Sequence, residues 1–389
     1  MHLPIFHSAH ARDKKQGLRT SLYVSIFIRS IAGSLIHIFV PIYLYQLGFG
    51  LKGVALFYLM VSVTIPLIFF LGMYLTARGG TKISMTIGTL FEIGYLYVLG
   101  SVTSVPGIVL IAFLWSLSVG FYWSGYHVFF LKSRKRSSQG SYIALTKLTS
   151  TAASILGPLV GALIIYIASF NDLFLTAALL LMGSLVPLLL TGNNKIRFPV
   201  PRARAILSAD TTPKAASYVA DGALDYISAA FWPIFMYLYV TDIISIGAIE
   251  SGAVLFTAAA VLLFGRMADR DKRAALRYSV LLQSPTWILR LVFTAPWGIF
   301  FMNLISKCTK SMLDTAFSYY LYSETPAGKQ TVPYLLFHEL YLSVGRFWMA
   351  LFVFFTGNLT ALFIAAFFLT FTYLFLLSSK HVPRRLAAL

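Results

Sequence analysis

The stretch LFGRMADRDKRAALRYSV, residues 263–280, places six charged side chains within the nine positions from Gly265 to Arg273. This density stands out because only 11% of the 389 residues are charged, while 58% are hydrophobic. Soluble domains are about 25% charged. Long apolar segments flank the stretch on both sides, so we expect a loop at the surface of a membrane. The composition excludes a soluble enzyme.

Twelve apolar segments are long enough to cross a bilayer, which takes roughly 20 helical residues. The sequence therefore predicts an all-α membrane protein with 12 transmembrane helices. Their expected ranges are 20–46, 51–76, 83–101, 106–131, 141–169, 171–191, 215–240, 247–265, 275–294, 297–322, 331–356 and 359–379.

The basic residues lie mainly on one side of these spans. With the N-terminus placed in the cytoplasm, about 24 of the 31 Lys and Arg residues fall in cytoplasmic loops and tails, and Lys52 alone falls in an outer loop. Cytoplasmic loops are enriched in Lys and Arg, so we expect a multi-pass protein of the cytoplasmic (inner) membrane with both termini in the cytoplasm. Topology and anionic headgroups account for the formal net charge of +18. No nucleic-acid partner is expected.

Two pairs of segments indicate an internal repeat. FVPIYLY starts at residue 39 and FWPIFMY at residue 231, an offset of 231 − 39 = 192. GMYLTARGGTK starts at Gly72 and GRMADRDKR at Gly265, an offset of 265 − 72 = 193. The two offsets differ by one residue and predict a duplicated six-helix unit, which is a known transporter architecture. We expect a six-helix bundle at 1–191, a cytoplasmic linker at 192–214 and a second six-helix bundle at 215–389.

These features resemble the major facilitator superfamily, whose loop between the second and third helices reads roughly G-x-L-A-D-R-x-G-R-K. The loop after the eighth span matches it at Gly265, Met267, Ala268, Asp269, Arg270 and Arg273. The first-half copy keeps Gly72 but has Thr76 where the Asp is expected. The resemblance implies the major facilitator fold. It also implies that Gly72, Gly265, Asp269, Arg270 and Arg273 form a latch between the two halves. Asp269 can also cap a nearby helix N-terminus. The alternative is that these charges only set the topology.

The segment ILGPLVGAL (155–163) resembles the antiporter motif that the family carries in its fifth helix. The motif would assign Gly157, Pro158 and Gly161 to conformational gating, and it implies export. Pro158 lacks a backbone donor and bends the helix. The alternative is tight packing through an ordinary GxxxG pair.

Ionisable side chains inside membrane spans are costly unless they are paired or hydrated, so each is a functional candidate. In the resembled family, the first, fourth, seventh and tenth helices line a central cavity. On this basis we predict that Arg29, Trp123, Lys307 and Arg346 bind substrate. Asp221, Asp225, Asp314 and Glu339 are predicted to carry protons. Internal ion pairing is the alternative role for all the charged candidates.

Three further charged residues are not among the predicted substrate or proton sites. Lys310 is four residues from Asp314 and is expected to be neutralised by it. Arg290 lies near the outer end of its span, where a long basic side chain can extend to the membrane surface. Glu92 lies on the third helix, which the family places outside the cavity.

The leading prediction is a secondary transporter that moves a small amphiphilic or anionic organic compound by alternating access, with proton-coupled export. The expected partners are the solute, protons or another coupling ion, and the lipid bilayer. We expect a monomer with no cofactor and no metal. Uptake, or the flipping of a lysolipid or sugar derivative, is one alternative, and a non-transporting membrane receptor is another. An enzyme is not expected, because FHELYL (337–342) has Leu342 where a zinc protease needs its second His.

Overall fold

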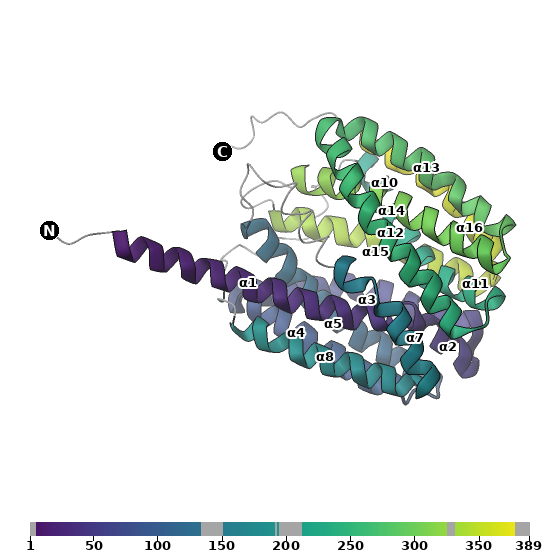
Figure 1. The fold of residues 1–389 in the computed structure, drawn as a ribbon, viewed down its shortest axis with the longest axis horizontal. Helices are drawn as coiled ribbons and strands as arrows, with labels where there is room; N and C mark the ends of the chain where they lie inside the picture. The colour runs from purple at the N-terminus through teal and green to yellow at the C-terminus, as the bar shows by residue number, and fades with distance from the viewer. Residues whose placement is uncertain (1–4, 134–150, 191–192, 194–211, 325–330, 378–389) are drawn as a thin grey trace.

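The computed structural model describes residues 5–133, 151–190, 193, 212–324 and 331–377. The regular elements within these ranges are all helices, so the predicted all-α class is confirmed. Figure 1 shows the purple-to-teal first part of the chain and the green-to-yellow second part as two bundles packed against each other.

The first bundle begins with α1, whose N-terminal end projects beyond the rest of the molecule (Figure 1). Its elements are α1 (Ile5–Ile36), α2 (Phe39–Leu44), a π-helical turn (Tyr45–Phe49), α3 (Gly50–Gly79), α4 (Thr81–Leu99), α5 (Val105–Ser133), α7 (Gly157–Ile167) and α8 (Phe170–Leu190).

The second bundle also begins with an interrupted helix. Its elements are α10 (Thr212–Tyr226), a π-helical turn (Ile227–Phe231), α11 (Trp232–Tyr239), α12 (Ile243–Arg270), α13 (Lys272–Val292), α14 (Pro296–Glu324), α15 (Thr331–Thr356), α16 (Leu359–Thr370) and a 3₁₀ segment (Phe371–Leu377). Most of the predicted linker, residues 194–211, lies outside the described residues.

The first helix of each bundle is interrupted at equivalent positions of the repeat. A proline lacks a backbone donor, and its ring clashes with the carbonyl group four residues earlier. For Pro41 that residue is His37, where α1 gives way to α2. For Pro233 it is Ala229, inside the π-helical turn before α11. The sequence repeat therefore has a structural counterpart, and the single span predicted at 20–46 is a broken helix.

Five stretches of the described chain are helical, long and apolar enough to cross a membrane: Ser21–Gly79, Val105–Phe129, Phe170–Leu190, Val332–Thr356 and Leu359–Leu377. The first of these contains the end of α1, α2 and all of α3. Large apolar side chains such as Leu67 and Leu190 are exposed on the outer surface. These features point to a multi-pass membrane protein. The count of 12 spans remains a prediction.

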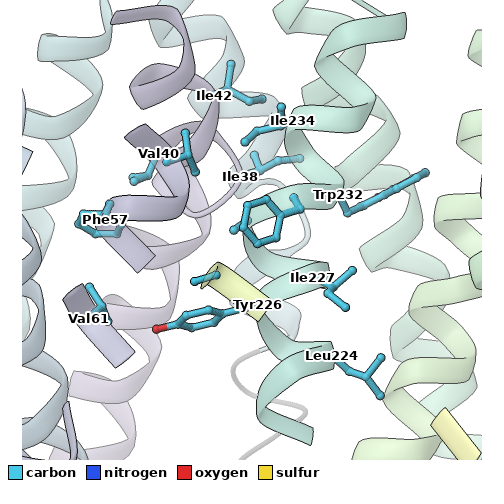
Figure 2. Close-up of a cluster of buried hydrophobic side chains, with 14 of the residues drawn as sticks. Ile38, Val40, Ile42, Phe57, Val61, Leu224, Tyr226, Ile227, Trp232 and Ile234 are labelled. Atoms are coloured by element: carbon cyan, nitrogen blue, oxygen red, sulfur yellow. The ribbon is translucent and has the colours of Figure 1, made fainter. Parts of the chain in front are cut away.

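The two bundles meet along an apolar seam. Ile38 and Ile42 from the first bundle lie beside Ile234 from the second (Figure 2). Near the far end of this seam, the Gln46 side-chain amide donates a hydrogen bond of 2.8 Å to the Tyr237 hydroxyl. Elsewhere α3 packs on α15, and α7 packs on α12.

Two glycines bring α10 and α15 into backbone contact. A Cβ atom on Gly345 would overlap the carbonyl oxygen of Val219, and one on Gly222 would overlap the carbonyl oxygen of Leu342. Small residues allow this approach between membrane helices. Asp225 lies three residues after Gly222, and Arg346 directly follows Gly345. The contact therefore sets the distance between these two charged side chains.

We expect Gly345→Ala to destabilise the protein by about 1–3 kcal/mol, because the added methyl group would push two backbones apart. Gly183→Ala is the matched control, since no atom lies within 4 Å of a Cβ at that exposed position of α8. It should be neutral or stabilising by up to about 1 kcal/mol, because alanine favours helix. Thermal unfolding of the purified protein measures both changes. Equal effects of the two substitutions would contradict the close contact.

Candidate functional site

A cavity of about 370 Å³ lies between the two bundles. Its wall comes from α1, α2, α3, α4 and α5 on one side and from α10, the π-helical turn after it and α15 on the other. Pockets of 300–1,000 Å³ are typical of sites for small organic ligands. Four charged side chains from both bundles line it, namely Arg29, Glu92, Asp225 and Arg346. The aromatic part of the wall consists of Phe57, Tyr58, Tyr95, Trp115, Trp123 and Tyr226.

Arg29 is the centre of the charged wall in the first bundle. Its guanidinium forms an ion pair with Glu92 of α4 and lies 3.7 Å from the centre of the Tyr122 ring of α5. A third contact, to the Thr89 hydroxyl, measures 3.4 Å. The Arg29 and Glu92 side chains are only 16% and 5% exposed. The charge of Arg29 is thus neutralised within the bundle, and its contacts fasten α1 to α4 and α5.

Arg346 is the cavity-lining arginine of the second bundle, and it has two acidic partners. One terminal nitrogen lies 2.9 Å from a Glu339 carboxylate oxygen, and the other lies 3.3 Å from Asp225. The Arg346 and Glu339 side chains are largely buried, whereas the Asp225 side chain is 48% exposed. One cation and two carboxylates give this cluster a formal charge of −1. We call Asp225, Glu339 and Arg346 the acidic triad.

The predicted substrate and proton residues are divided between the cavity and its surroundings. Arg29, Trp123, Asp225 and Arg346 line the cavity, and Glu339 lies behind Arg346. Lys307, Asp221 and Asp314 are absent from the described lining.

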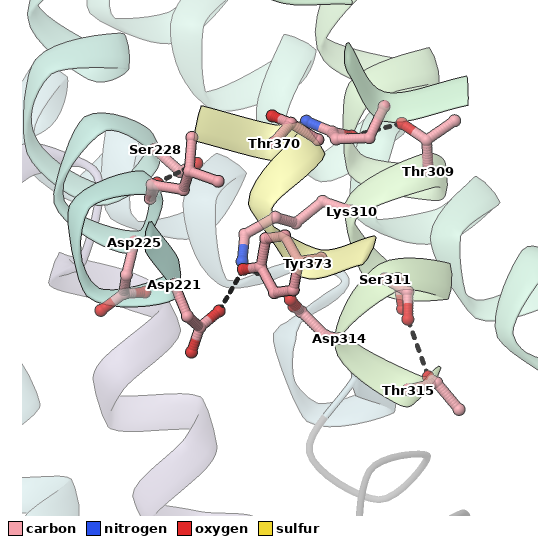
Figure 3. Close-up of polar contacts among 12 residues, drawn as sticks. Asp221, Asp225, Ser228, Thr309, Lys310, Ser311, Asp314, Thr315, Thr370 and Tyr373 are labelled. Atoms are coloured by element: carbon pink, nitrogen blue, oxygen red, sulfur yellow. Dashed lines mark hydrogen bonds and ion pairs between the residues drawn. The ribbon is translucent and has the colours of Figure 1, made fainter. Parts of the chain in front are cut away.

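Asp221 and Asp314 belong to a separate polar cluster around α10, α14 and the last 3₁₀ segment. Asp221 accepts a hydrogen bond from the Tyr373 hydroxyl, and Lys310 lies 2.7 Å from Asp314, as predicted for that pair. Figure 3 shows Asp221 directed toward Tyr373 and Asp225 directed away from it. The two aspartates of α10 therefore face different surroundings.

Lys307 also has an internal partner. It pairs with Glu250 of α12 at 2.5 Å, and Asn303 donates to the other Glu250 oxygen at 3.0 Å. The Trp232 indole nitrogen in turn donates to Asn303 at 2.9 Å. This chain of contacts ties α14 and α12 to the start of α11.

The described side chains contain no group of three or more His, Cys, Asp and Glu residues suited to hold a metal ion. The cavity instead combines paired charges, aromatic rings and aliphatic side chains. Such a wall can enclose an organic molecule and exchange polar contacts with it.

No protein-family model matches the sequence, and no curated protein matches it either. Solved structures do resemble the fold. A mutant of the nucleoside transporter NupG superposes with a TM-score of 0.71 at 12% identity, over 93% of this chain and 99% of that one. The human organic anion transporter MFSD10 (TETRAN) gives 0.66 at 15% identity, with the same coverage. The chain has the major facilitator fold.

Within this fold, the Gly-Pro segment lies at a junction of three helices. Cβ atoms on Gly157 and Gly161 would overlap Ser34 and the carbonyl oxygen of Leu35 in α1. On another side, the Leu159 amide donates 2.9 Å to the Ser251 hydroxyl of α12. Pro158 presents its carbonyl oxygen to Gly247 of α12, where a Cβ atom would lie only 2.7 Å away. The segment therefore packs against both bundles, and a gating role for it remains a prediction.

The predicted latch residues fall in different places. Gly72 packs α3 on α5, since a Cβ there would lie 2.6 Å from the Gly120 carbonyl oxygen. The backbone of Gly265, Asp269 and Arg270 belongs to the end of α12, and their side chains lie outside the described part of the structure. Arg273 is exposed in the first turn of α13.

The N-cap of α13 is Asp271, and the cap role predicted for Asp269 falls on a side chain outside the described part of the structure. The Asp271 carboxylate accepts hydrogen bonds from the backbone amides of Arg273 and Ala274, at 2.9 and 3.1 Å. These bonds hold the pKa of the exposed Asp271 carboxyl below its ordinary value of 3.8.

The structure corrects two predictions about charged residues. Glu92 lines the cavity, because Arg29 needs a buried counter-charge and α4 supplies it. Arg290 does not extend to the membrane surface. It is 3% exposed, lies 4.0 Å from the centre of the Trp232 ring and donates to Ser306 at 2.7 Å. Glu250 was not among the candidates, although an unpartnered Lys307 in a span is a signal that a nearby carboxylate exists.

Removing one partner of a buried ion pair leaves the other charge uncompensated. We therefore expect Glu92→Gln to lower the free energy of unfolding by about 3 kcal/mol. The double variant Arg29→Gln/Glu92→Gln should be more stable than the Glu92→Gln single variant, because it leaves no isolated charge. Thermal unfolding of the four proteins of this double-mutant cycle measures the coupling. Additive effects of the two substitutions would show that the pair contributes nothing.

The lowered pKa of Asp271 predicts a local pH dependence. A folded-state pKa below the unfolded one adds stability that is present above the unfolded value of 3.8 and is lost as the pH falls through the folded value. Amide hydrogen exchange at Arg273 and Ala274 should accelerate over that acidic range in the wild type, after correction for intrinsic exchange. Asp271→Asn should lack this pH dependence, since its amide can cap but cannot titrate. An identical pH profile in the variant would contradict the cap.

Proposed function

We propose that this protein is a secondary transporter of a small amphiphilic organic compound, which it moves by alternating access between its two bundles. One observation carries the proposal: a single cavity is lined by charged side chains from both bundles. A solute bound there contacts both bundles at once, so its binding energy can favour one arrangement of the bundles over another. Fold similarity to a nucleoside transporter and an organic anion transporter supports the same mechanism.

The paired charges bear on the proposed solute. Arg29, Lys307 and Arg346 were predicted to bind substrate, yet each has an acidic partner within its own bundle. An anion would have to compete with these carboxylates. The aromatic and aliphatic wall supports the amphiphilic part of the prediction, because it offers apolar area beside a few polar groups.

Proton coupling is proposed for the acidic triad. Protonation of Glu339 or Asp225 removes the surplus negative charge and loosens the hold on Arg346. This gives a proton a direct effect on a cavity-lining side chain. The cluster of Asp221, Lys310 and Asp314 adjoins the triad along α10 and is proposed as a second proton-accessible group.

The remaining finer features belong to the same proposal. The transporter has 12 spans, with bundles at 1–191 and 215–389 joined by the linker at 192–214, and it acts as a monomer in the cytoplasmic membrane with both termini inside. The loop after α12 and the Gly157-Pro158-Gly161 junction control movement between the bundles. Export is the proposed direction, on the resemblance of that junction to the antiporter motif.

Transport is tested with purified protein in proteoliposomes. A thermal-shift screen against metabolites and drugs selects a solute, which is then radiolabelled and followed in counterflow exchange. Saturable exchange above the rate of protein-free liposomes is expected. Binding without any exchange would favour a non-transporting receptor and contradict the proposal.

Proton coupling is tested with the variant Glu339→Gln. The Glu339 side chain lies behind the cavity wall, where it pairs with Arg346. We expect this variant to lose accumulation driven by a pH gradient while it retains counterflow, because exchange needs no net proton movement. Asp172→Asn, at an exposed position in the first turn of α8, is the matched control and should behave as wild type. Unchanged gradient-driven accumulation in Glu339→Gln would remove Glu339 from the coupling mechanism.

A further inference from the structure

Asp225 is the most accessible charged group of the two ion-pair clusters at the cavity. Its side chain is 48% exposed, against 15% for Arg346, 16% for Arg29 and 5% for Glu92. Its 3.3 Å contact to Arg346 is also looser than the 2.9 Å contact between Arg346 and Glu339. One side of the Asp225 carboxylate is therefore free to meet a solute.

The formal charge of the two ion-pair clusters at the cavity is negative, which favours a bound cation. Arg29 and Glu92 cancel formally, while the acidic triad has two carboxylates for one guanidinium. Among the described residues of these clusters, one negative charge is thus left without a counter-charge. A bound monocation would neutralise it, whereas an anion would add to it.

Aromatic groups lie beside the same carboxylate. The Tyr58 and Tyr226 rings both line the cavity and meet edge to face, with centroids 4.8 Å apart. Ring faces attract cations. The buried Tyr226 hydroxyl has no hydrogen-bond partner among the described residues. Figure 2 shows it pointing across to Val61 of α3, which also lines the cavity. A solute with a polar head can supply the missing partner.

From these observations we propose that the cavity recognises an organic ammonium ion, whose charged nitrogen binds Asp225 beside Tyr58 and Tyr226. The rest of the solute is apolar and lies against Ile36, Val61 and Val119. This inference rests on the proposed transport function and names its solute class. It keeps the amphiphilic solute of the sequence prediction and replaces the anionic alternative with a cation.

The test uses three probes of nearly the same shape: 2-phenylethylammonium, 2-phenylethanol and 3-phenylpropanoate. Their affinities for the purified full-length protein are measured by isothermal titration calorimetry at pH 7. The ammonium is expected to bind about tenfold or more tightly than the alcohol, since a charge-assisted bond adds to the same apolar contacts. The carboxylate is expected to bind most weakly.

Variants of Asp225 connect the preference to this carboxylate. Asp225→Asn should weaken ammonium binding about tenfold and leave the alcohol unchanged, whereas Asp225→Glu should retain the preference. Asp172→Asn controls for removal of an exposed carboxylate outside the cavity. Thermal unfolding of each variant verifies that it is folded.

Three results would overturn the inference: tighter binding of 3-phenylpropanoate than of the ammonium, equal losses for all probes in Asp225→Asn, or no saturable binding of any probe to the wild type. The proposed transport function can fail separately. Selective ammonium binding without counterflow exchange would refute transport alone, and exchange of a solute with no ammonium preference would refute this inference alone.

Discussion

An ionised side chain among apolar helices needs an opposite charge close by, and this requirement organises the interior of the protein. Four basic groups described in the bundle interior are accommodated in different ways. Arg29 and Lys307 have one carboxylate each, Arg346 has two, and Arg290 lies against tryptophan rings beside a serine hydroxyl. Because the pairs join different helices, the same contacts that neutralise charge also determine how the helices of each bundle are arranged.

The two bundles neutralise their buried charges with different residues, although both begin with an interrupted helix. Arg29 corresponds to Asp221 in the repeat, so an equivalent position holds opposite charges. In the first bundle the ion pair joins α1 to α4, and in the second the triad joins α10 to α15. The opening helices of the two bundles are interrupted at equivalent positions, while their charged groups differ. The cavity between the bundles is therefore asymmetric, with a neutral wall on one side and an acidic wall on the other.

Much of the fold could be predicted from the sequence because its causes are local or periodic. Apolar stretches predict helices, and Pro41 and Pro233 account for the interruptions in the first helix of each bundle. The long-range ion-pair partners of the charged residues could not be predicted from the sequence. Arg29 and Glu92 are 63 residues apart and Lys307 and Glu250 are 57 apart, so their pairing depends on helix rotation, which no spacing rule describes. The contact of Gly222 and Gly345 was missed for the same reason, since each glycine stands alone in its own helix.

The interrupted opening helices have a mechanical consequence. An intact helix resists bending because its hydrogen-bond ladder must be disrupted, whereas a break or π-helical turn concentrates bending at one place. The short pieces α2 and α11 meet across the seam, where Gln46 in the π-helical turn after α2 bonds to Tyr237 of α11. Bending at these breaks would tilt α2 and α11, and it would move the Val40 side chain of α2, which lines the cavity. A change of helix angle at the breaks would therefore reshape one end of the cavity.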